Sequence, residues 1–158
     1  MTEKIRTLQK IHSFVDIAKS ISQLSTSSRL KVGAIAVHKQ FQKIASFGYN
    51  GNYAGAPISE ETGTEEESNE PGKDGFIHAE INLIAKFRED NPKDYIVILT
   101  HSPCKMCSKV LINAGFRYIY WIEEYRDTEH LDIFCENKHM FTGNIDDLCQ
   151  DYEYICKL

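Results

Sequence analysis

The sequence lacks the features of a membrane protein, a secreted protein or a broad nucleic-acid binder. No apolar run among its 158 residues approaches the roughly 20 residues that a membrane span requires. The first residues, MTEKIRTLQK, carry charges of both signs and no apolar stretch, so we expect no secretory signal. The net charge of -5 disfavours broad binding to nucleic acid, which needs a basic surface. We therefore expect a cytoplasmic protein with neither a membrane nor a polynucleotide partner.

The cysteines number five, an odd number, and Cys104 and Cys107 form the one CxxC pair. Without a secretory signal, this pattern indicates reduced thiols in a cytosol, with metal or redox chemistry at the pair. The length predicts one domain, residues 1–158, that buries about two thirds of the surface of its unfolded chain.

Acidic residues concentrate in one stretch, residues 59–74, with the sequence SEETGTEEESNEPGKD. It holds seven acidic residues and one Lys, together with Gly, Ser and Pro and almost nothing apolar. Such a composition cannot bury a core, so we predict a solvated loop insert at about 59–75.

The hydrophobic pattern elsewhere predicts helices that alternate with strands. Apolar residues recur at three- and four-residue steps over 3–23, which predicts a helix. Residues 31–38 and 43–49 alternate as the two strands of a hairpin do. Further along we predict a helix over 77–88, a strand over 95–100, a helix from Pro103 to Gly115, a strand over 118–122, a helix from Asp127 or Thr128 to about Lys138, and a strand at YEYIC, residues 152–156. This alternation indicates an α/β layered fold.

Two short motifs begin successive predicted helices, HAE at His78–Glu80 and PCKMC at 103–107. Cys104 and Cys107 lie three residues apart in a first turn, where the partial positive charge of a helix end favours thiolate, the form that binds zinc. His78, Cys104 and Cys107 would leave one position open on tetrahedral zinc, as catalytic sites do. A water in that position has its pKa lowered to roughly 7, and Glu80 is then free to carry its proton.

Other interpretations of these residues stay open. His78 and Glu80 also suit the first turn of an ordinary helix, and a CxxC alone is found in redox sites and structural zinc sites. A closed structural site needs a fourth ligand. The candidates are His101, Cys135, His139, Cys149 and Cys156, none of which forms a second CxxC or an HxxxH pair. The two motifs together are therefore more specific than either alone.

The sequence resembles the zinc-dependent nucleotide deaminases, whose signature joins H-x-E to P-C-x-x-C. Within them it is most similar to the deoxycytidylate (dCMP) deaminase family. The segments that carry this likeness are KVGAIAV, FGYNG, IHAEIN, SPCKMCSKVLINAG and EYRDTE, which together span about Ser25 to Glu129.

The resemblance implies a cytidine-deaminase-like fold, in which helices cover both faces of a mixed five-stranded sheet in three α/β/α layers. It also implies hydrolysis of dCMP to dUMP and ammonia, which supplies dUMP for thymidylate synthesis. By the same likeness His78, Cys104 and Cys107 are the ligands of one Zn²⁺ per chain, and Glu80 is the catalytic proton shuttle.

The resemblance also suggests how the nucleotide is held. Asn50 matches the Asn that binds the sugar, although Asn-Gly is also a common turn pair. The backbone near Ala79 would hold the pyrimidine edge, and Tyr125 would pack on the base or complete the core. Ser25 and Arg29 match a segment before the first strand whose hydroxyl and guanidinium groups would bind the phosphate.

Two departures from the family pattern limit what is carried over. Ser27 stands where some members have a Cys that binds a second, structural zinc, and the insert offers no Cys or His, so we expect one zinc. Tyr53 replaces the family's Pro in GYNGNY, so regulation by dCTP and dTTP stays open. The family likeness implies a homo-oligomer, often a hexamer. The alternative functions are deamination of dCTP, free cytidine or deoxycytidine, or tRNA adenosine, and a catalytically idle zinc-binding interaction module.

Overall fold

A computed structural model describes residues 2–56, 75–125, 129–136 and 139–158. Five strands form one mixed sheet in the order β2-β1-β3-β4-β5. They are β1 (Gly33–His38), β2 (Ile44–Tyr49), β3 (Tyr95–His101), β4 (Tyr118–Glu123) and β5 (Phe141–Asn144). β1 pairs antiparallel with both β2 and β3, whereas β3, β4 and β5 run parallel.

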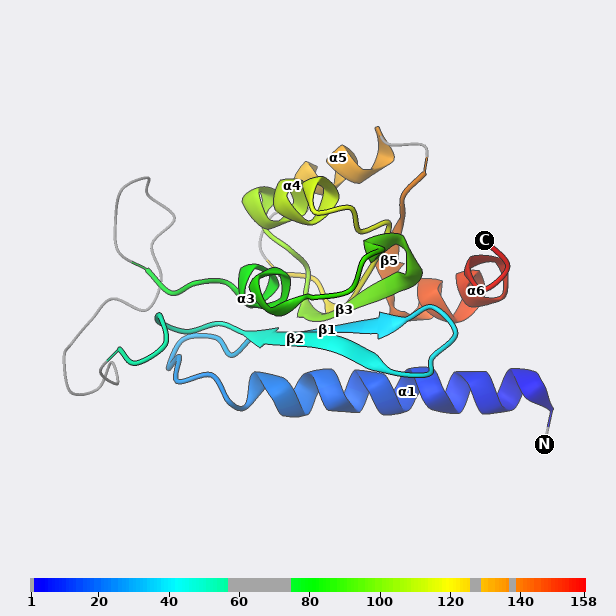
Figure 1. Ribbon diagram of the computed structural model, residues 1–158, viewed down its shortest axis with the longest axis horizontal. Helices are drawn as coiled ribbons and strands as arrows, with labels where there is room; N and C mark the ends of the chain where they lie inside the picture. The colour runs from blue at the N-terminus through cyan, green and yellow to red at the C-terminus, as the bar shows by residue number, and fades with distance from the viewer. Residues whose placement is uncertain (1, 57–74, 126–128, 137–138) are drawn as a thin grey trace.

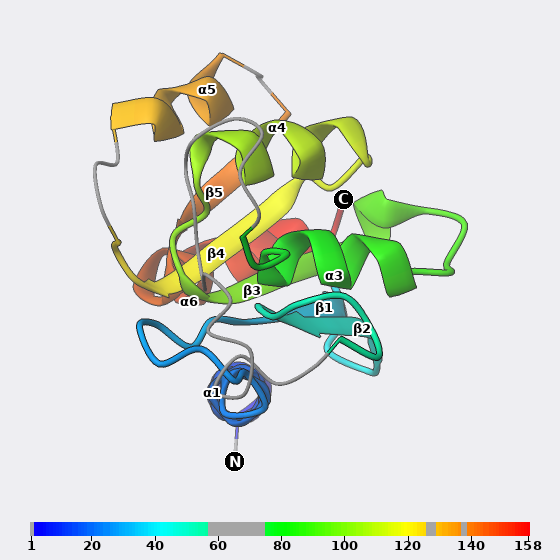
Figure 2. The same cartoon turned by 90° about the vertical axis from the view of Figure 1, so that its left-hand side faces the viewer.

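Helices cover both faces of this sheet, which confirms the three-layer α/β/α prediction (Figures 1 and 2). On one face, α1 (Glu3–Ser22) and α6 (Ile145–Ile155) pack against the strands. On the other lie α3 (Ala79–Lys86), α4 (Lys105–Asn113) and the short α5 (Asp132–Cys135). Two 3₁₀ turns, η1 (Pro92–Asp94) and η2 (Glu129–Leu131), complete the described elements.

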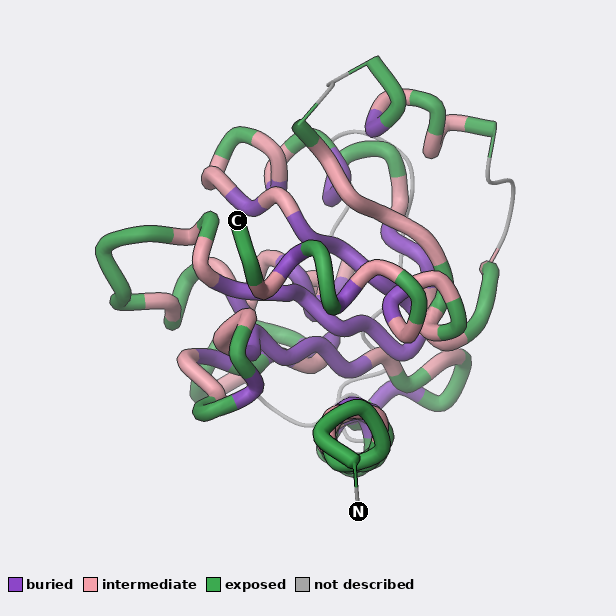
Figure 3. The backbone as a smooth tube through the Cα atoms, turned by 90° about the vertical axis from the view of Figure 1, so that its right-hand side faces the viewer, coloured by how far each residue is buried: buried purple, intermediate pink, exposed green. Residues whose placement is uncertain are grey.

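Each face of the sheet supports its own apolar core, because successive side chains of a strand point to opposite faces. Ile35, Ile96 and Ile98 are fully buried against α1 and α6. Ala34, Val97 and Leu99 are fully buried against α3 and α4. The central strands are therefore buried from both sides (Figure 3), as their nearly continuous apolar runs predict.

The N-terminal elements agree closely with the sequence prediction. The first helix and the hairpin are confirmed, and α3 begins and ends two residues inside the predicted range 77–88. α4 ends with Gly115 just beyond its cap at a φ of 102°, the left-handed region that Gly adopts without a Cβ clash.

The C-terminal predictions were partly wrong. YEYIC is not a strand, because residues 152–155 form the end of α6 and the fifth strand comes from Phe141–Asn144. Buried Leu148, Tyr152 and Ile155 recur at helical spacing. A capping box between Asn144 and Asp147 starts the helix and overrides the β propensity of Tyr and Ile.

The helix predicted to reach about Lys138 is instead the turn η2 followed by a single turn of α5, which ends at Cys135. Its predicted caps, Asp127 and Thr128, lie outside the described residues, as does nearly all of the acidic insert predicted at about 59–75. Among the helices that the structure describes, none is both long enough and apolar enough to cross a membrane.

Candidate metal centre and its cavity

The sheet topology brings the predicted site residues to one edge. β2, β3 and β4 point the same way, because β1 is antiparallel to both β2 and β3 while β4 is parallel to β3. Asn50 follows β2, Cys104 lies three residues beyond β3, and Tyr125 lies two residues beyond β4. This is the carboxyl edge at which open α/β sheets bind ligands.

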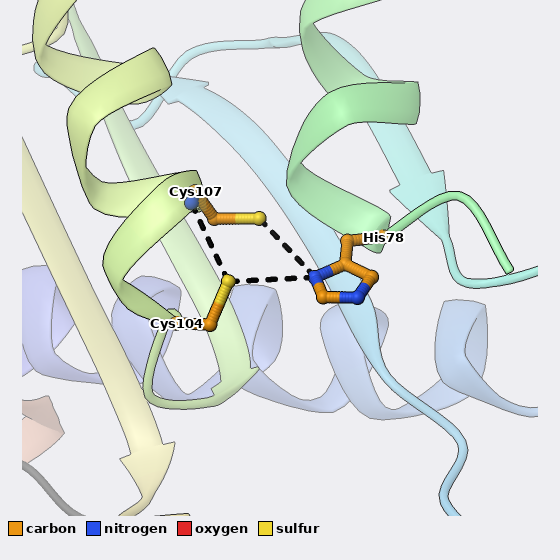
Figure 4. A group of neighbouring side chains, drawn as sticks. All are labelled: His78, Cys104 and Cys107. Carbon is orange, nitrogen blue, oxygen red and sulfur yellow. Dashed lines mark hydrogen bonds between the residues drawn. The ribbon is translucent and has the colours of Figure 1, made fainter. Parts of the chain in front are cut away.

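Three potential metal ligands meet at this edge, His78, Cys104 and Cys107 (Figure 4). His78 is the N-cap of α3, and its side chain makes no capping hydrogen bond, so the ring faces the cysteines instead. Cys104 is the N-cap of α4, and its sulfur accepts from the backbone N–H of Cys107 at 3.4 Å. Two helix starts therefore present the three side chains to one point.

The spacing of these atoms fits zinc. His78 Nδ1 lies 3.6 Å from Cys104 Sγ and 3.4 Å from Cys107 Sγ. Tetrahedral zinc bonds sulfur at about 2.3 Å and nitrogen at about 2.0–2.1 Å, which places such atoms about 3.5 Å apart. One central ion therefore reaches all three atoms, and Nδ1 is the ring nitrogen that we expect to bind it.

The protonation of the two cysteines favours metal binding. The hydrogen bond from Cys107 lowers the pKa of Cys104 to about 3, and His78 contributes in the same direction. The same contact with Cys104, together with burial, raises the pKa of Cys107. The contact thus favours the thiolate of Cys104, and a cation between the sulfurs would favour loss of the proton on Cys107 as well.

Glu80 lies in the first turn of α3 with 4% of its surface exposed, and it lines the cavity beside the three ligands. Burial raises the pKa of its carboxyl group to about 6. A carboxyl group with this pKa gains and loses a proton readily near neutral pH, which suits a general acid–base. The structure therefore places Glu80 where the sequence predicted a proton carrier.

A cavity of about 240 Å³ opens beside His78 and Cys104. The residues lining it are Leu30, Val32, Asn50, Phe76, His78, Ala79, Glu80, His101, Ser102, Cys104, Lys105, Tyr125 and His130. Of the predicted substrate contacts, Asn50, Ala79 and Tyr125 are in this set. Ser25 and Arg29 are not, and the Ser25 hydroxyl, 3% exposed, accepts from the backbone N–H of Ser27 at 3.2 Å.

The Asn50 carboxamide organises the cavity wall. Its Oδ1 accepts from Val32 N–H and its Nδ2 donates to the Leu30 carbonyl, both at 2.8 Å. These bonds join the end of β2 to the loop before β1. One N–H of the amide and one lone pair of its oxygen are left, which is enough to bind a ligand. The sugar-binding role of Asn50 stays a prediction.

His101 and Tyr125 form an aromatic corner of the cavity, with ring centroids 6.0 Å apart and an edge-on arrangement. Burial lowers the pKa of His101. Tyr125 is placed by its backbone, whose N–H donates to Ser102 Oγ at 2.8 Å. The sequence left Tyr125 open between the base and the core, and the structure puts it at the cavity.

Sequence reasoning assigned no role to several lining residues, among them Phe76, Lys105 and His130. Phe76 and Lys105 each lie within two residues of a motif member, so proximity to the motifs was an available signal. His130 offered none, because it follows β4 by seven residues in a segment predicted as an ordinary helix.

Strand β2 of the hairpin packs closely against α3. Gly48 faces the helix so closely that an added Cβ would meet the backbone of Ala79 and Leu83. Ser46 Oγ donates to the Leu83 carbonyl at 2.7 Å, and Asn82 Nδ2 donates to the Tyr49 carbonyl at 2.8 Å. The start of the helix that carries His78 and Glu80 is therefore fixed to β2.

Comparison with known proteins is consistent with this geometry. Residues 8–123 match the model of the cytidine and deoxycytidylate deaminase zinc-binding region. ComE operon protein 2 of Bacillus subtilis is 35% identical over 104 residues, which cover 65% of this chain and 53% of that protein. A probable deoxycytidylate deaminase of Caenorhabditis elegans is 31% identical over 116 residues, covering 73% of this chain and 58% of that protein. This chain thus spans just over half the length of these two relatives.

A solved structure of similar size is the dCMP deaminase of the cyanophage S-TIM5, in complex with dCMP and dUMP. It superposes with a TM-score of 0.68 at 27% sequence identity, over 91% of this chain and 98% of the phage chain.

Proposed function

Because the chain belongs to the cytidine and deoxycytidylate deaminase zinc-binding family, we propose that it hydrolyses dCMP to dUMP and ammonia. One observation carries the proposal. His78, Cys104 and Cys107 cluster with zinc spacing, and His78, Cys104 and the buried Glu80 line one cavity. The similarity to deoxycytidylate deaminases, and to a phage enzyme that binds both dCMP and dUMP, favours that substrate.

In this proposal zinc, held by His78, Cys104 and Cys107, supplies Lewis-acid activation of the water that replaces the amino group. Glu80 supplies the proton transfers. Its carboxylate accepts one proton from that water and delivers it to N3 of the pyrimidine. It then takes the second proton from the hydroxyl now on C4, which becomes the carbonyl, and delivers it to the departing amine. Burial keeps its pKa near neutrality, so both protonation states are accessible during a cycle. Water and dCMP thereby become dUMP and ammonia.

The residues proposed to hold the nucleotide differ in their support. Ala79, Asn50 and Tyr125 line the cavity, so the base and sugar are proposed to lie against them. Ser25 and Arg29 are proposed for the phosphate on the family pattern alone, since neither lines the cavity. Among the described lining residues, Lys105 is the one Lys or Arg. Arg29→Ala and Lys105→Ala, assayed with dCMP and with deoxycytidine, separate these two cations as partners of the phosphate.

Ammonia release from purified, zinc-loaded protein tests the function. We expect turnover of dCMP well above that of dCTP, deoxycytidine or a tRNA anticodon stem-loop. Glu80→Gln should lower kcat by about 10²–10⁴-fold while zinc stays bound at one ion per chain. A protein that releases no ammonia from dCMP contradicts the proposal. Full activity in the Glu80→Gln variant would contradict the role of Glu80. If both the native protein and the variant bind zinc but neither releases ammonia, the protein is an idle zinc module.

We further propose that the protein acts in the cytoplasm as a homo-oligomer and supplies dUMP for thymidylate synthesis. The family likeness supports this. The net charge of -5 disfavours a polynucleotide substrate. Light scattering during size exclusion, with and without dCTP or dTTP, measures the oligomer and its response to both nucleotides. A monomer that is active without either one would contradict the oligomer proposal.

A further inference from the structure

In its described residues, the chain that follows β4 contacts the turn that carries Cys104. We call the described part of this stretch, residues 123–125 and 129–135, the crossing segment. At its start, Ser102 N–H donates to the Glu123 carbonyl at 2.8 Å, and Tyr125 N–H donates to Ser102 Oγ at 2.8 Å. At its end, Phe134 is 1% exposed in the core beneath α4. Between these anchors, a side chain of the described residues contacts the turn that carries Cys104.

That side chain is His130. Its Nε2 lies 2.7 Å from the carbonyl oxygen of Pro103, the residue that precedes Cys104. A carbonyl can only accept, so Nε2 carries the proton and donates it. The same ring lines the cavity. His130 therefore contacts both the backbone beside a predicted ligand and the space where the substrate is proposed to lie.

The Pro103 carbonyl needs this partner. Helical bonding in α4 begins at the Cys104 carbonyl, which accepts from Ser108 N–H at 2.9 Å, so the helix offers nothing to Pro103. Pro103 is buried, and a buried carbonyl without a donor costs free energy. The bond also fixes the plane of the peptide between Pro103 and Cys104, from which the Cys104 side chain leaves.

We propose that His130 is a positioning residue for the metal centre. By donating to the Pro103 carbonyl it fixes the direction in which Cys104 presents its sulfur, so that the sulfur, Cys107 and His78 surround one ion. This adds a residue from the crossing segment to a centre otherwise built on the starts of α3 and α4. The zinc affinity tests this positioning role directly. The proposal rests on the proposed function only where dCMP turnover is measured.

Glutamine and asparagine at position 130 test the bond with little change in polarity. The amide nitrogen of Gln occupies roughly the place of Nε2, whereas the shorter Asn places its amide near Nδ1. His130→Gln therefore keeps a donor for Pro103, and His130→Asn and His130→Ala remove it. Glu136→Ala, at an exposed site one residue beyond the crossing segment, is the matched control.

Zinc affinity is measured by competition with a chelating dye, and the site geometry by the absorption of the cobalt-substituted protein. We expect His130→Ala and His130→Asn to bind zinc about tenfold more weakly, with an altered cobalt spectrum. His130→Gln and Glu136→Ala should stay within about twofold of the native protein. With dCMP, kcat should fall in the Ala and Asn variants while KM changes little.

Three results would overturn the proposal. The first is native zinc affinity and an unchanged cobalt spectrum in His130→Ala and His130→Asn. The second is a His130→Gln variant that binds zinc as weakly as His130→Asn, because the bond to Pro103 would then not account for the effect on the metal site. The third is a raised KM with unaltered metal binding, which would make His130 a substrate contact. If the metal results hold but no variant, nor the native protein, deaminates dCMP, the positioning role stands and the proposed function fails. Should the Ala variant not fold, the comparison of Gln with Asn decides.

Discussion

The two halves of the metal centre are held in different ways. The His78 half belongs to α3, which lies against β2 with no room for an atom at Gly48. The cysteine half belongs to the start of α4, which is held by hydrogen bonds to the crossing segment through Ser102 and His130. The closest contact of the first half joins backbone to backbone, with added side-chain bonds from Ser46 and Asn82. The second half meets the crossing segment through two side-chain bonds and the backbone bond from Ser102 to Glu123.

This difference predicts how each half responds to substitution. Backbone atoms in a packed layer cannot move aside for an added group without shifting a whole element, so changes at the hairpin should affect folding itself. A side-chain hydrogen bond contributes about 0.5–1.5 kcal/mol net, so changes at the crossing segment should adjust the site while the fold persists.

The largest effect is expected for Gly48→Ala. The new Cβ would meet the Ala79 carbonyl and the Leu83 amide, both in the backbone of α3. We expect a loss of about 3 kcal/mol in the free energy of unfolding, because neither element can yield alone. Gly51→Ala is the matched control, since a Cβ there meets nothing within 4 Å. Denaturant unfolding and zinc content measure both variants, and native-like stability in Gly48→Ala would refute the rigid contact.

An intermediate effect is expected for Asn82→Ala. The substitution removes the bond from Asn82 Nδ2 to the Tyr49 carbonyl, which joins α3 to the residue before Asn50. We expect a loss of about 1–2 kcal/mol in stability, because a partly buried carbonyl loses its donor. KM for dCMP should also rise as Asn50 loosens. Asn113→Ala, exposed at the end of α4, should change neither quantity. Unfolding curves and initial rates decide, and a stability equal to that of the control would show that this bond holds nothing.

The same contrast explains what the sequence could predict. Strands β1 to β4, α1 and the two motifs follow from local patterns, namely apolar periodicity and the spacing of His78, Glu80, Cys104 and Cys107. The fold class and the family were therefore within reach. The close approach at Gly48 could not be predicted, because a glycine in a strand gives no indication of which backbone lies opposite it.

The C-terminal third was less predictable for a physical reason. In YEYIC the β propensity of Tyr and Ile competes with a capping box at Asn144 and with helical burial, and these tertiary terms win. The role of His130 could not be predicted from the sequence either. Its partner, the Pro103 carbonyl, is a backbone atom 27 residues away, and backbone acceptors leave no residue-type signal in a sequence.

The smallest effect is expected for Ser102→Ala, in the cysteine half of the metal centre. Ser102 is 6% exposed, and its hydroxyl accepts from Tyr125 N–H and lies 3.3 Å from the Tyr125 carbonyl. Its removal should cost about 1 kcal/mol, without loss of zinc, because the rest of the turn stays packed. Ser13→Ala, on the exposed face of α1, serves as the control and should cost less.

The double variant Ser102→Ala with His130→Ala shows whether the crossing segment acts as one unit. Both side chains join that segment to the same turn, one at Tyr125 and the other at Pro103. Once the first bond is lost, the segment is freer to move and the second bond contributes less. We therefore expect the two losses in unfolding free energy to sum to more than the loss in the double variant, by about 0.5 kcal/mol or more. Strict additivity in denaturant unfolding would mean that the two contacts hold the turn independently, and that only the His130 bond bears on the direction of Cys104.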